Sequence, residues 1–377
     1  MRIRTASLLL AFPSLALYLL VGCSSAPRAV TPTVPASRTY NGTASVGDFM
    51  TITIDSSAQT IAYTDVSNST SGTVPYTVNS DGTYTLNDPK GNLVGAYEVP
   101  NYALLIQAAK AGPNADAPAL ITAVESGQIS LATFEGQAYN YMQFRTAAGG
   151  LEVGSVSVNA QGVGSNSSFW PYGAYNAGNQ GQSPFNSGTI DMTQAQLDSS
   201  GTFLKIPEPN NPSVYDYVFG TANGIFAVDT TNGAILGLKK APSKGFDPTV
   251  AGTYKAIYYQ KTGASTGQGN VETGTPSQGN ATLVVTSGGQ VTVSDAQGNQ
   301  MAQGTLTAVA DTSYLYGSSG ELQDPCYGVF TFRATNSGVS QQDVFVSFLG
   351  QSMLFSSFTA NLAQQGTYNY FYGVGLK

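Results

Sequence analysis

The chain contains no histidine and is poor in charged residues, cysteine and tryptophan. Of its 377 residues only 10% are charged, two are cysteine and one is tryptophan. Without an imidazole, serine or cysteine triads and histidine metal sites are excluded, and two cysteines cannot form a cysteine metal cluster. No glycine-rich phosphate loop with a following lysine and hydroxyl residue is present. We therefore expect no metal and no cofactor.

The few charges are mostly negative. The chain has 22 acidic and 15 basic residues, which gives a net charge of −7. An acidic surface repels a phosphate backbone, so nucleic acid is excluded as a partner. The hydrophobic fraction of 41% is enough for a buried core. The composition thus indicates a folded protein whose surface is hydrated mainly by hydroxyl and amide groups.

The first 25 residues form the most informative segment. Arg2 and Arg4 precede an apolar stretch that ends in Leu20-Val21-Gly22-Cys23, with Ser24 behind it. This resembles a bacterial lipoprotein signal, which implies a signal peptide over residues 1–22 and a lipid anchor, such as palmitate, on Cys23. The residue after the cysteine is Ser24 and not an aspartate, and in this respect the signal resembles those of lipoproteins of the cell outer membrane. An uncleaved membrane anchor is the alternative, but Pro13 and the small residues at the end disfavour it.

The lipidated Cys23 is followed by a segment without apolar periodicity. Residues 23–38 are rich in proline, serine and alanine, which predicts a flexible linker between the membrane and the folded part. Once Cys23 carries lipid, Cys326 has no partner for a disulfide bond within the chain. We expect Cys326 to be buried and the fold to depend on packing alone.

After the linker, one pattern recurs along the chain. Two apolar strands flank a glycine turn from Leu120, from Ile225 and from Val344, and each pair precedes a strand rich in tyrosine. Tyr40, Tyr139, Tyr254 and Tyr368 mark these tyrosine strands, and they follow one another at similar intervals. Agreement in order and spacing predicts a triplicated unit with one additional strand at the end.

Within each unit, apolar and polar residues alternate with period two. Met50, Ile52 and Ile54 are separated by polar residues, and glycine or Asx-Gly turns punctuate the runs. The chain is therefore predicted to be all-β, with three tandem antiparallel β-barrel or β-sandwich units of lipocalin-like size. The predicted units span 39–135, 136–245 and 246–377. If each unit is completed by the strand that opens the next, residues 367–373 supply the closing strand of the third.

Carboxylates are the remaining candidates for catalysis. Paired acids can cleave glycosidic bonds, one as an acid and the other as a nucleophile or base. The acids in or near predicted strands are Glu98, Glu125, Glu208, Asp216 and Asp229. The sequence does not show which of them, if any, lie at a working distance from each other, and single acids on β-proteins are mostly surface groups. We assign no catalytic residue.

One long connection contains aromatic residues together with amides. Phe169, Trp170, Tyr172 and Tyr175 lie among asparagine, glutamine and glycine. Flat rings beside amide groups could bind sugar rings or a protein partner. The alternative is a lid, in which the same aromatic residues fold back over one end of a barrel.

These observations favour a lipid-anchored cell-envelope β-protein with a binding or scaffolding role and no catalytic activity. The partners that suit this role are the membrane, through Cys23, and an envelope glycan, an envelope protein or a small apolar ligand. The first alternative is a carbohydrate-active hydrolase with paired carboxylates. The second is a purely structural surface lipoprotein. Filled barrel interiors would favour a scaffold, and a cavity with two facing acids would favour the hydrolase.

Overall fold

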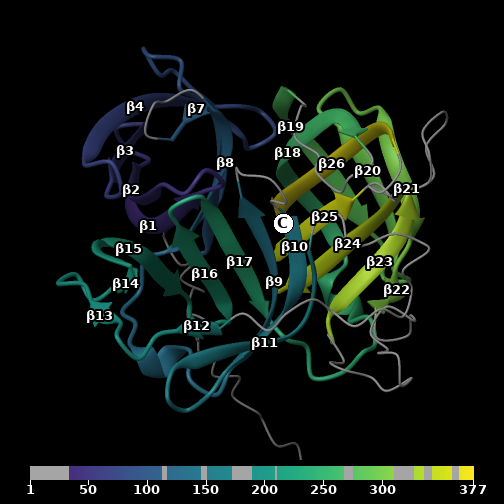
Figure 1. Ribbon diagram of the computed structural model, residues 1–377. Helices are drawn as coiled ribbons and strands as arrows, with labels where there is room; N and C mark the ends of the chain where they lie inside the picture. Colours follow the sequence, from purple (N-terminus) through teal and green to yellow (C-terminus); the bar gives the residue numbers. More distant parts are fainter. Residues whose placement is uncertain are drawn as a thin grey trace, which may run out of the picture. The chain divides into compact units, whose positions relative to one another are not determined.

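A computed structural model describes residues 34–112, 117–145, 151–171, 189–208, 210–266, 275–309, 327–334, 342–358 and 365–377. Figure 1 shows the strands of this part in chain order. The regular elements in these ranges are 26 strands and two short 3-10 helices, η1 (Leu131–Thr133) and η2 (Pro248–Val250). The strands form three antiparallel sheets, one after another along the chain. The predicted all-β class with three tandem units is confirmed.

The first sheet is a closed barrel, here called barrel 1. Its strands are β1 (Ser37–Ala44), β2 (Phe49–Asp55), β3 (Thr60–Asp65), β4 (Thr70–Val78), β5 (Tyr84–Leu86), β6 (Leu93–Val99), β7 (Ala103–Ala111) and β8 (Ala117–Glu125). Neighbouring strands pair in chain order, and β8 pairs with β1 to close the ring. Closure leaves no free strand edge in this sheet.

Sheet 2 has nine strands, and the strand that comes first in the chain, β9, pairs with the one that comes last, β17. They are β9 (Ala138–Arg145), β10 (Leu151–Val158), β11 (Val163–Pro171), β12 (Thr189–Asp191), β13 (Gln196–Leu197), β14 (Leu204–Glu208), β15 (Asn211–Gly220), β16 (Ile225–Thr230) and β17 (Gly233–Lys239). The two edges are the short strands β12 and β13, which are neighbours in the chain. Short edge strands expose few unpaired backbone groups.

Sheet 3 repeats this arrangement, because β18 pairs with β26. Its strands are β18 (Gly252–Thr266), β19 (Thr275–Val285), β20 (Gln290–Asp295), β21 (Gln300–Thr305), β22 (Thr307–Ala308), β23 (Val329–Ala334), β24 (Gln342–Leu349), β25 (Ser352–Phe358) and β26 (Gln365–Leu376). The edges of this sheet are β21 and β22.

In each sheet, the first strand along the chain therefore pairs with the last, although only barrel 1 is fully closed. The expectation that a unit is completed by the strand that opens the next one is wrong, since β8 pairs with β1, β17 with β9 and β26 with β18. Strand β26, which contains Tyr368, is the last strand of sheet 3 and not a spare opening strand. The first and last strands of a unit find each other because they are the two ends of one meander.

The other three tyrosines occupy equivalent places. Tyr40, Tyr139 and Tyr254 lie in the opening strands β1, β9 and β18, and they are among the largest fully buried side chains. Each belongs to the apolar cluster enclosed by its own sheet. The tyrosine repeat thus corresponds to one structural position, the inward side of the first strand.

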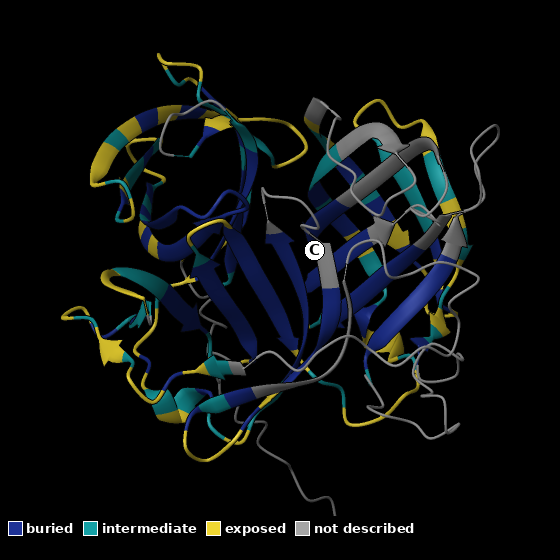
Figure 2. Ribbon diagram, viewed as in Figure 1, coloured by how far each residue is buried: buried dark blue, intermediate teal, exposed yellow. Residues whose placement is uncertain are grey.

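Four apolar clusters hold the described part together. Three of them are enclosed by barrel 1, sheet 2 and sheet 3 respectively. The fourth, here called the shared cluster, consists of residues that alternate with the enclosed ones on the same strands and come from all three sheets. Figure 2 shows β9, β16 and β17 buried along most of their length. Strands covered on both faces read as nearly continuous apolar runs, as residues 234–238 do.

Direct contacts join each pair of sheets. The ring of Phe49 in barrel 1 stacks on Tyr217 of sheet 2, with centroids 4.5 Å apart. Phe144 of sheet 2 stacks on Tyr372 of sheet 3. Tyr102 of barrel 1 donates its hydroxyl to the carbonyl oxygen of Leu349 in sheet 3, at 2.9 Å. The sheets thus pack as one body through the shared cluster.

Glycine makes two close approaches possible, one between barrel 1 and sheet 2 and one within sheet 3. Gly47, in the turn between β1 and β2, has φ of +91°, and a Cβ there would lie 2.3 Å from the carbonyl oxygen of Thr230 in sheet 2. Gly373 lies opposite Phe355 across a strand pair, and its Cβ would meet the ring at 2.3 Å. A side chain at either place would push the facing groups apart. In the described part of the chain, no helix has the length and apolar composition to cross a membrane.

Candidate functional site

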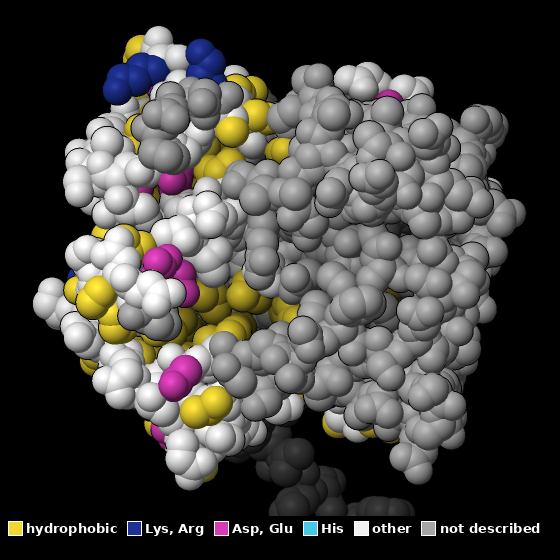
Figure 3. Space-filling view, viewed as in Figure 1, with side chains coloured by type: hydrophobic (Ala, Val, Ile, Leu, Met, Phe, Trp, Pro, Cys, Tyr) yellow, Lys and Arg dark blue, Asp and Glu magenta, His cyan; other side chains and the backbone are white. Residues whose placement is uncertain are grey.

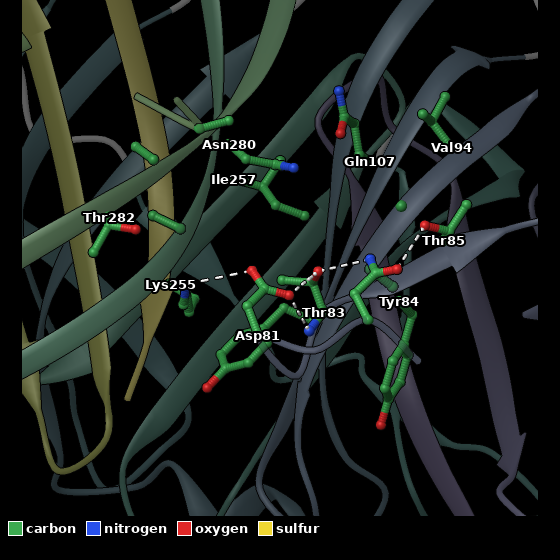
Figure 4. Close-up of a pocket in the computed structure, with 17 residues that line it drawn as sticks. Asp81, Thr83, Tyr84, Thr85, Val94, Gln107, Lys255, Ile257, Asn280 and Thr282 are labelled. Carbon is green, nitrogen blue, oxygen red and sulfur yellow. Dashed lines mark hydrogen bonds and ion pairs between the residues drawn. The ribbon is translucent and has the colours of Figure 1, made fainter. Parts of the chain in front are cut away.

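A groove lies between barrel 1 and sheet 3. It has a volume of about 290 Å³, close to the lower limit of small-molecule sites. Its walls are formed by Asn79, Asp81, Thr83, Tyr84, Thr85, Val94, Gly95, Ala96, Tyr97 and Gln107 of barrel 1, and by Lys255, Ala256, Ile257, Asn280, Ala281, Thr282 and Ala296 of sheet 3. Figure 4 shows that the two walls face each other. We call this site the inter-barrel groove.

The wall from sheet 3 is built by two paired strands. Lys255 of β18 lies opposite Thr282 of β19, and Ile257 lies opposite Asn280. Direct partners in an antiparallel pair project from the same face, so these four side chains form one patch. The residues between them, Ala256 and Ala281, turn inward into the cluster that sheet 3 encloses.

The wall from barrel 1 contains a β-bulge. The pairing of β6 with β7 shifts register between Leu93 and Gly95, which leaves Val94 as the extra residue. A bulge redirects side chains, and Val94 is 43% exposed here. Gly95 lies opposite Gln107, and a Cβ on Gly95 would lie 3.7 Å from the Oε1 atom of Gln107. The small Gly95 therefore leaves the groove open in front of the amide.

The two charged residues of the groove are paired with each other. Lys255 Nζ lies 3.4 Å from Asp81 Oδ2, and Thr83 donates its hydroxyl to the same carboxylate at 2.7 Å. These bonds and the lysine charge lower the pKa of Asp81 below its ordinary value. The pair is partly exposed and salt-screened, so it adds little stability. Its effect is to leave the groove electrically neutral.

Behind the barrel 1 wall, Tyr84 connects the groove to a buried polar network. The hydroxyl of Tyr84 donates to Glu98 Oε2 at 2.7 Å, and Tyr40 donates to Glu98 Oε1 at 2.5 Å. Arg38 completes the network with bonds of 2.6 and 2.8 Å to the two carboxylate oxygens. Burial and the bond to Glu98 raise the pKa of both tyrosines. Glu98 thus serves in a closed structural network inside barrel 1.

This network corrects the predicted end of the linker. The composition of residues 23–38 predicts that Ser37 and Arg38 belong to the flexible linker, but both lie in β1, and Arg38 is only 7% exposed. A basic residue after a proline-rich stretch looks like part of a solvated linker. Here its guanidinium enters the barrel because Glu98 compensates its charge there.

Asp229 is buried between barrel 1 and sheet 2. Its carboxylate accepts a hydrogen bond from the hydroxyl of Thr43, and burial raises its pKa well above the ordinary value. The negative charges of Asp48, Asp65 and Asp216 raise this pKa further. Asp48 itself accepts bonds from the turns at Asn68 and Gly112, which fixes one end of the barrel. The prediction of a surface acid at 229 is wrong, because Asp229 is 1% exposed.

Replacing Asp229 by asparagine should raise the melting temperature at pH 7.5. Folding raises the pKa of the Asp229 carboxyl, so the folded state binds a proton there more readily than the unfolded state does. The protonated carboxyl gives its full contribution to stability below about pH 4, the ordinary pKa of aspartate. This contribution is lost as the pH rises through the pKa of Asp229 in the folded state. The gain from the substitution should therefore shrink on acidification. Thermal melts from pH 4 to pH 8 measure it. The exposed control Glu125→Gln should change the unfolding free energy by less than about 0.5 kcal/mol, and an Asp229→Asn variant less stable at pH 7.5 would contradict the assignment.

Two of the predicted acids lie near each other. Burial, and then the charge of Glu208, raise the pKa of Asp216 to about 6. Glu208 accepts a hydrogen bond from Thr231 at 3.0 Å. A carboxyl with such a pKa next to a second one is the feature that the hydrolase alternative requires. Neither residue lines the inter-barrel groove. Figure 3 shows hydrophobic side chains gathered over the region of sheet 2, with acidic side chains beside them.

The predicted aromatic site at residues 169–175 lies only partly within the described residues. The backbone of Phe169 and Trp170 lies in β11, where Gly154 and Val153 are their partners. Tyr172 and Tyr175 lie outside the described residues, as do Cys23 and Cys326. Ligand binding by these aromatic residues and lipidation of Cys23 therefore remain predictions.

The groove was not predicted from the sequence, because its residues come from separate segments of the chain. Asn79, Gln107 and Asn280 are single amides in strands or turns, and nothing in their local sequence distinguishes them. One usable signal was Gly95 within a strand, since such a glycine often marks a bulge or a close approach.

No family model and no curated protein matches the chain. Among solved structures, it is similar to a single-site mutant of the vaccine antigen transferrin binding protein B from Haemophilus parasuis Hp5, with 9% identity over 91% of this chain and 77% of that chain and a TM-score of 0.26. It is also similar to the isotype 1 transferrin binding protein B from serogroup B Neisseria meningitidis, with 11% identity over 88% and 66% and a TM-score of 0.28. At these TM-scores the likeness carries no argument about this chain.

Proposed function

We propose that this chain is a lipid-anchored, non-catalytic binding protein of the cell envelope, with the inter-barrel groove as its binding site. The observation that carries the proposal is the groove itself, about 290 Å³ in volume and lined from two sheets. The apolar residues of barrel 1 form a packed cluster in its interior, which is the arrangement expected of a scaffold, so the binding role rests on the groove and not on the barrel interior. The groove, in contrast, presents amide and hydroxyl groups to solvent.

The packing of the sheets supports a binding role. Ile257 in the groove belongs to the shared cluster, and Tyr97 packs against it. The walls are therefore held by the same contacts that join the sheets. A site whose walls are already fixed loses little conformational entropy on binding. Two of the five candidate acids have structural partners, since Glu98 pairs with Arg38 and Asp229 lies in an interface.

The variant Cys23→Ala tests both halves of the proposal. Cells producing the wild type or the variant are grown with labelled palmitate and separated into membrane and soluble fractions. The wild type should carry the label and remain with the membranes, whereas the variant should be unlabelled and soluble. Unlabelled wild type would contradict the lipid anchor.

The soluble variant then serves to test binding. Crystals are soaked with a library of small, chemically diverse fragments, and fragments are expected in the inter-barrel groove beside Gln107 or Asn280. A Gly95→Leu side chain should extend into the groove and exclude them, because a Cβ at this position meets only ordinary contacts. A groove that stays empty with every fragment would contradict the proposal. Hydrolysis of an added saccharide that is lost in Asp216→Asn would replace it with the hydrolase alternative.

A further inference from the structure

We infer that the inter-barrel groove binds an uncharged saccharide. The inference rests on the proposed function and names the chemical class of its ligand. It is carried by three properties of the described groove, which are its charge balance, its hydrogen-bonding groups and its apolar floor.

The charge balance excludes strongly charged ligands. Of the residues that line the groove, Asp81 and Lys255 are the charged ones, and they form an ion pair with each other. An anion that bound Lys255 would have to leave Asp81 without its cation, and a cation would do the reverse to Lys255. A neutral ligand leaves the pair in place.

The hydrogen-bonding groups suit hydroxyls. Gln107 comes from β7 and Asn280 from β19, so that an amide projects from each wall. Figure 4 shows these two side chains, with Thr282 farther along β19. Amides and threonine hydroxyls both donate and accept, as saccharide hydroxyls do. A ligand rich in hydroxyls can therefore satisfy both walls at once.

The floor of the groove is apolar. Ile257 is 3% exposed, and Tyr97 packs beside it against the shared cluster. Val94, redirected by the bulge, adds an exposed methyl surface on the barrel 1 side. A sugar ring presents C–H groups on its faces and hydroxyls around its edge. Its faces can thus lie against the floor while its edge reaches the amides.

Titration calorimetry with maltotriose, cellotriose and triacetylchitotriose tests the inference on the soluble Cys23→Ala protein. At least one of these trisaccharides should bind, and trigalacturonate, which has a similar size and carries carboxylates, should bind at least tenfold more weakly. Replacing Gln107 and Asn280 together by alanine should weaken binding about tenfold to a hundredfold, because two neutral hydrogen bonds are lost. Gly95→Leu should abolish binding by occupying the groove.

A matched control separates binding from folding. Gln161 is an exposed amide in the turn between β10 and β11, outside the groove, and Gln161→Ala should bind like the parent protein. Circular dichroism melts confirm that each variant is folded. Absence of trisaccharide binding, tighter binding of trigalacturonate, or binding unchanged in the double variant would overturn the inference. If fragments bind in the groove and saccharides do not, the saccharide inference is wrong and the proposed binding function still holds. If neither binds, both fail.

Discussion

Replacing Phe49 by alanine is expected to lower the free energy of unfolding by about 3–5 kcal/mol. Phe49 is fully buried, and its ring lies 4.6 Å from Phe203 and 5.4 Å from Phe219, in addition to the stack on Tyr217. Three aromatic partners from sheet 2 leave little room for the site to collapse after the ring is removed. The cost should therefore lie toward the upper part of the range for a large core residue.

The form of the transition is as informative as its midpoint. If the shared cluster joins the sheets into one cooperative body, urea unfolding followed by circular dichroism should show one transition, and Phe49→Ala should move all of it. Two transitions, with only one of them shifted, would show that the sheets unfold independently. The side chain of Val78 is 55% exposed, so the control Val78→Ala should change the free energy of unfolding by less than about 0.5 kcal/mol.

The sequence predicted strands and enclosed residues well where the pattern was local. Ile52 and Ile54 are fully buried inside barrel 1, and Tyr40, Tyr139 and Tyr254 mark the three opening strands as expected. A period of two is visible in a short window, because it follows from the alternation of side chains along one strand. Such signals do not depend on how the strands are arranged.

The predicted hairpin from Leu120 shows where a local pattern misleads. The strand β8 ends at Glu125, and the apolar residues beyond the glycine do not return along it. Ile129 belongs to the cluster enclosed by sheet 2, and Leu131 packs against that cluster. Apolar spacing alone does not distinguish a returning strand from a segment that covers the neighbouring sheet. The hairpins from Ile225 and Val344, in contrast, are present as β16 with β17 and β24 with β25.

The groove and the shared cluster depend on contacts between distant segments. Asp229 and Glu98 looked like surface acids because their partners, Thr43 and Arg38, are far away in sequence. The residues next to Arg38 and next to Glu98 in the sequence do not indicate that these two side chains form an ion pair across the barrel. Nearly continuous apolar runs such as residues 234–238 did contain a signal, since apolar and polar residues alternate in a strand that has one face exposed to solvent. That signal predicts burial on both faces, but it does not name the sheet that covers the second face.

Removing the guanidinium of Arg38 should also strongly destabilise barrel 1. The side chain of Glu98 is 0% exposed, and Arg38 is the cation bound to it. An Arg38→Ala variant leaves this carboxylate buried without a compensating charge, which typically costs about 3–5 kcal/mol. The loss is measured as the shift of the urea midpoint at pH 7.5. A variant within about 1 kcal/mol of the wild type would show that water reaches Glu98 readily.

The double variant Arg38→Met with Glu98→Leu separates charge from packing. Apolar residues in place of a buried ion pair are often nearly neutral for stability, so this variant should recover much of the loss. It should not recover all of it, because the hydroxyls of Tyr40 and Tyr84 would lose their acceptor, at about 1–3 kcal/mol for each buried group left unpaired. Adding Tyr40→Phe to the double variant removes one of these donors and should raise stability again. A fall in stability on that third change would mean that the Tyr40 hydroxyl has found another partner.

Arg38 also connects the barrel to the segment that precedes it. Its Nη1 atom donates to the carbonyl oxygen of Pro35 at 2.5 Å, and Ser56 donates to the carbonyl oxygen of Ala36 at 3.0 Å. Loss of the guanidinium should therefore free the chain before β1 as well as weaken the barrel. Limited proteolysis at 20 °C, where the variant is still folded, should then cleave near residues 35–37 faster in Arg38→Ala than in the Arg38→Lys control, which keeps a cation in the barrel. Equal cleavage rates would show that Ser56 and the strand pairing hold this segment without Arg38.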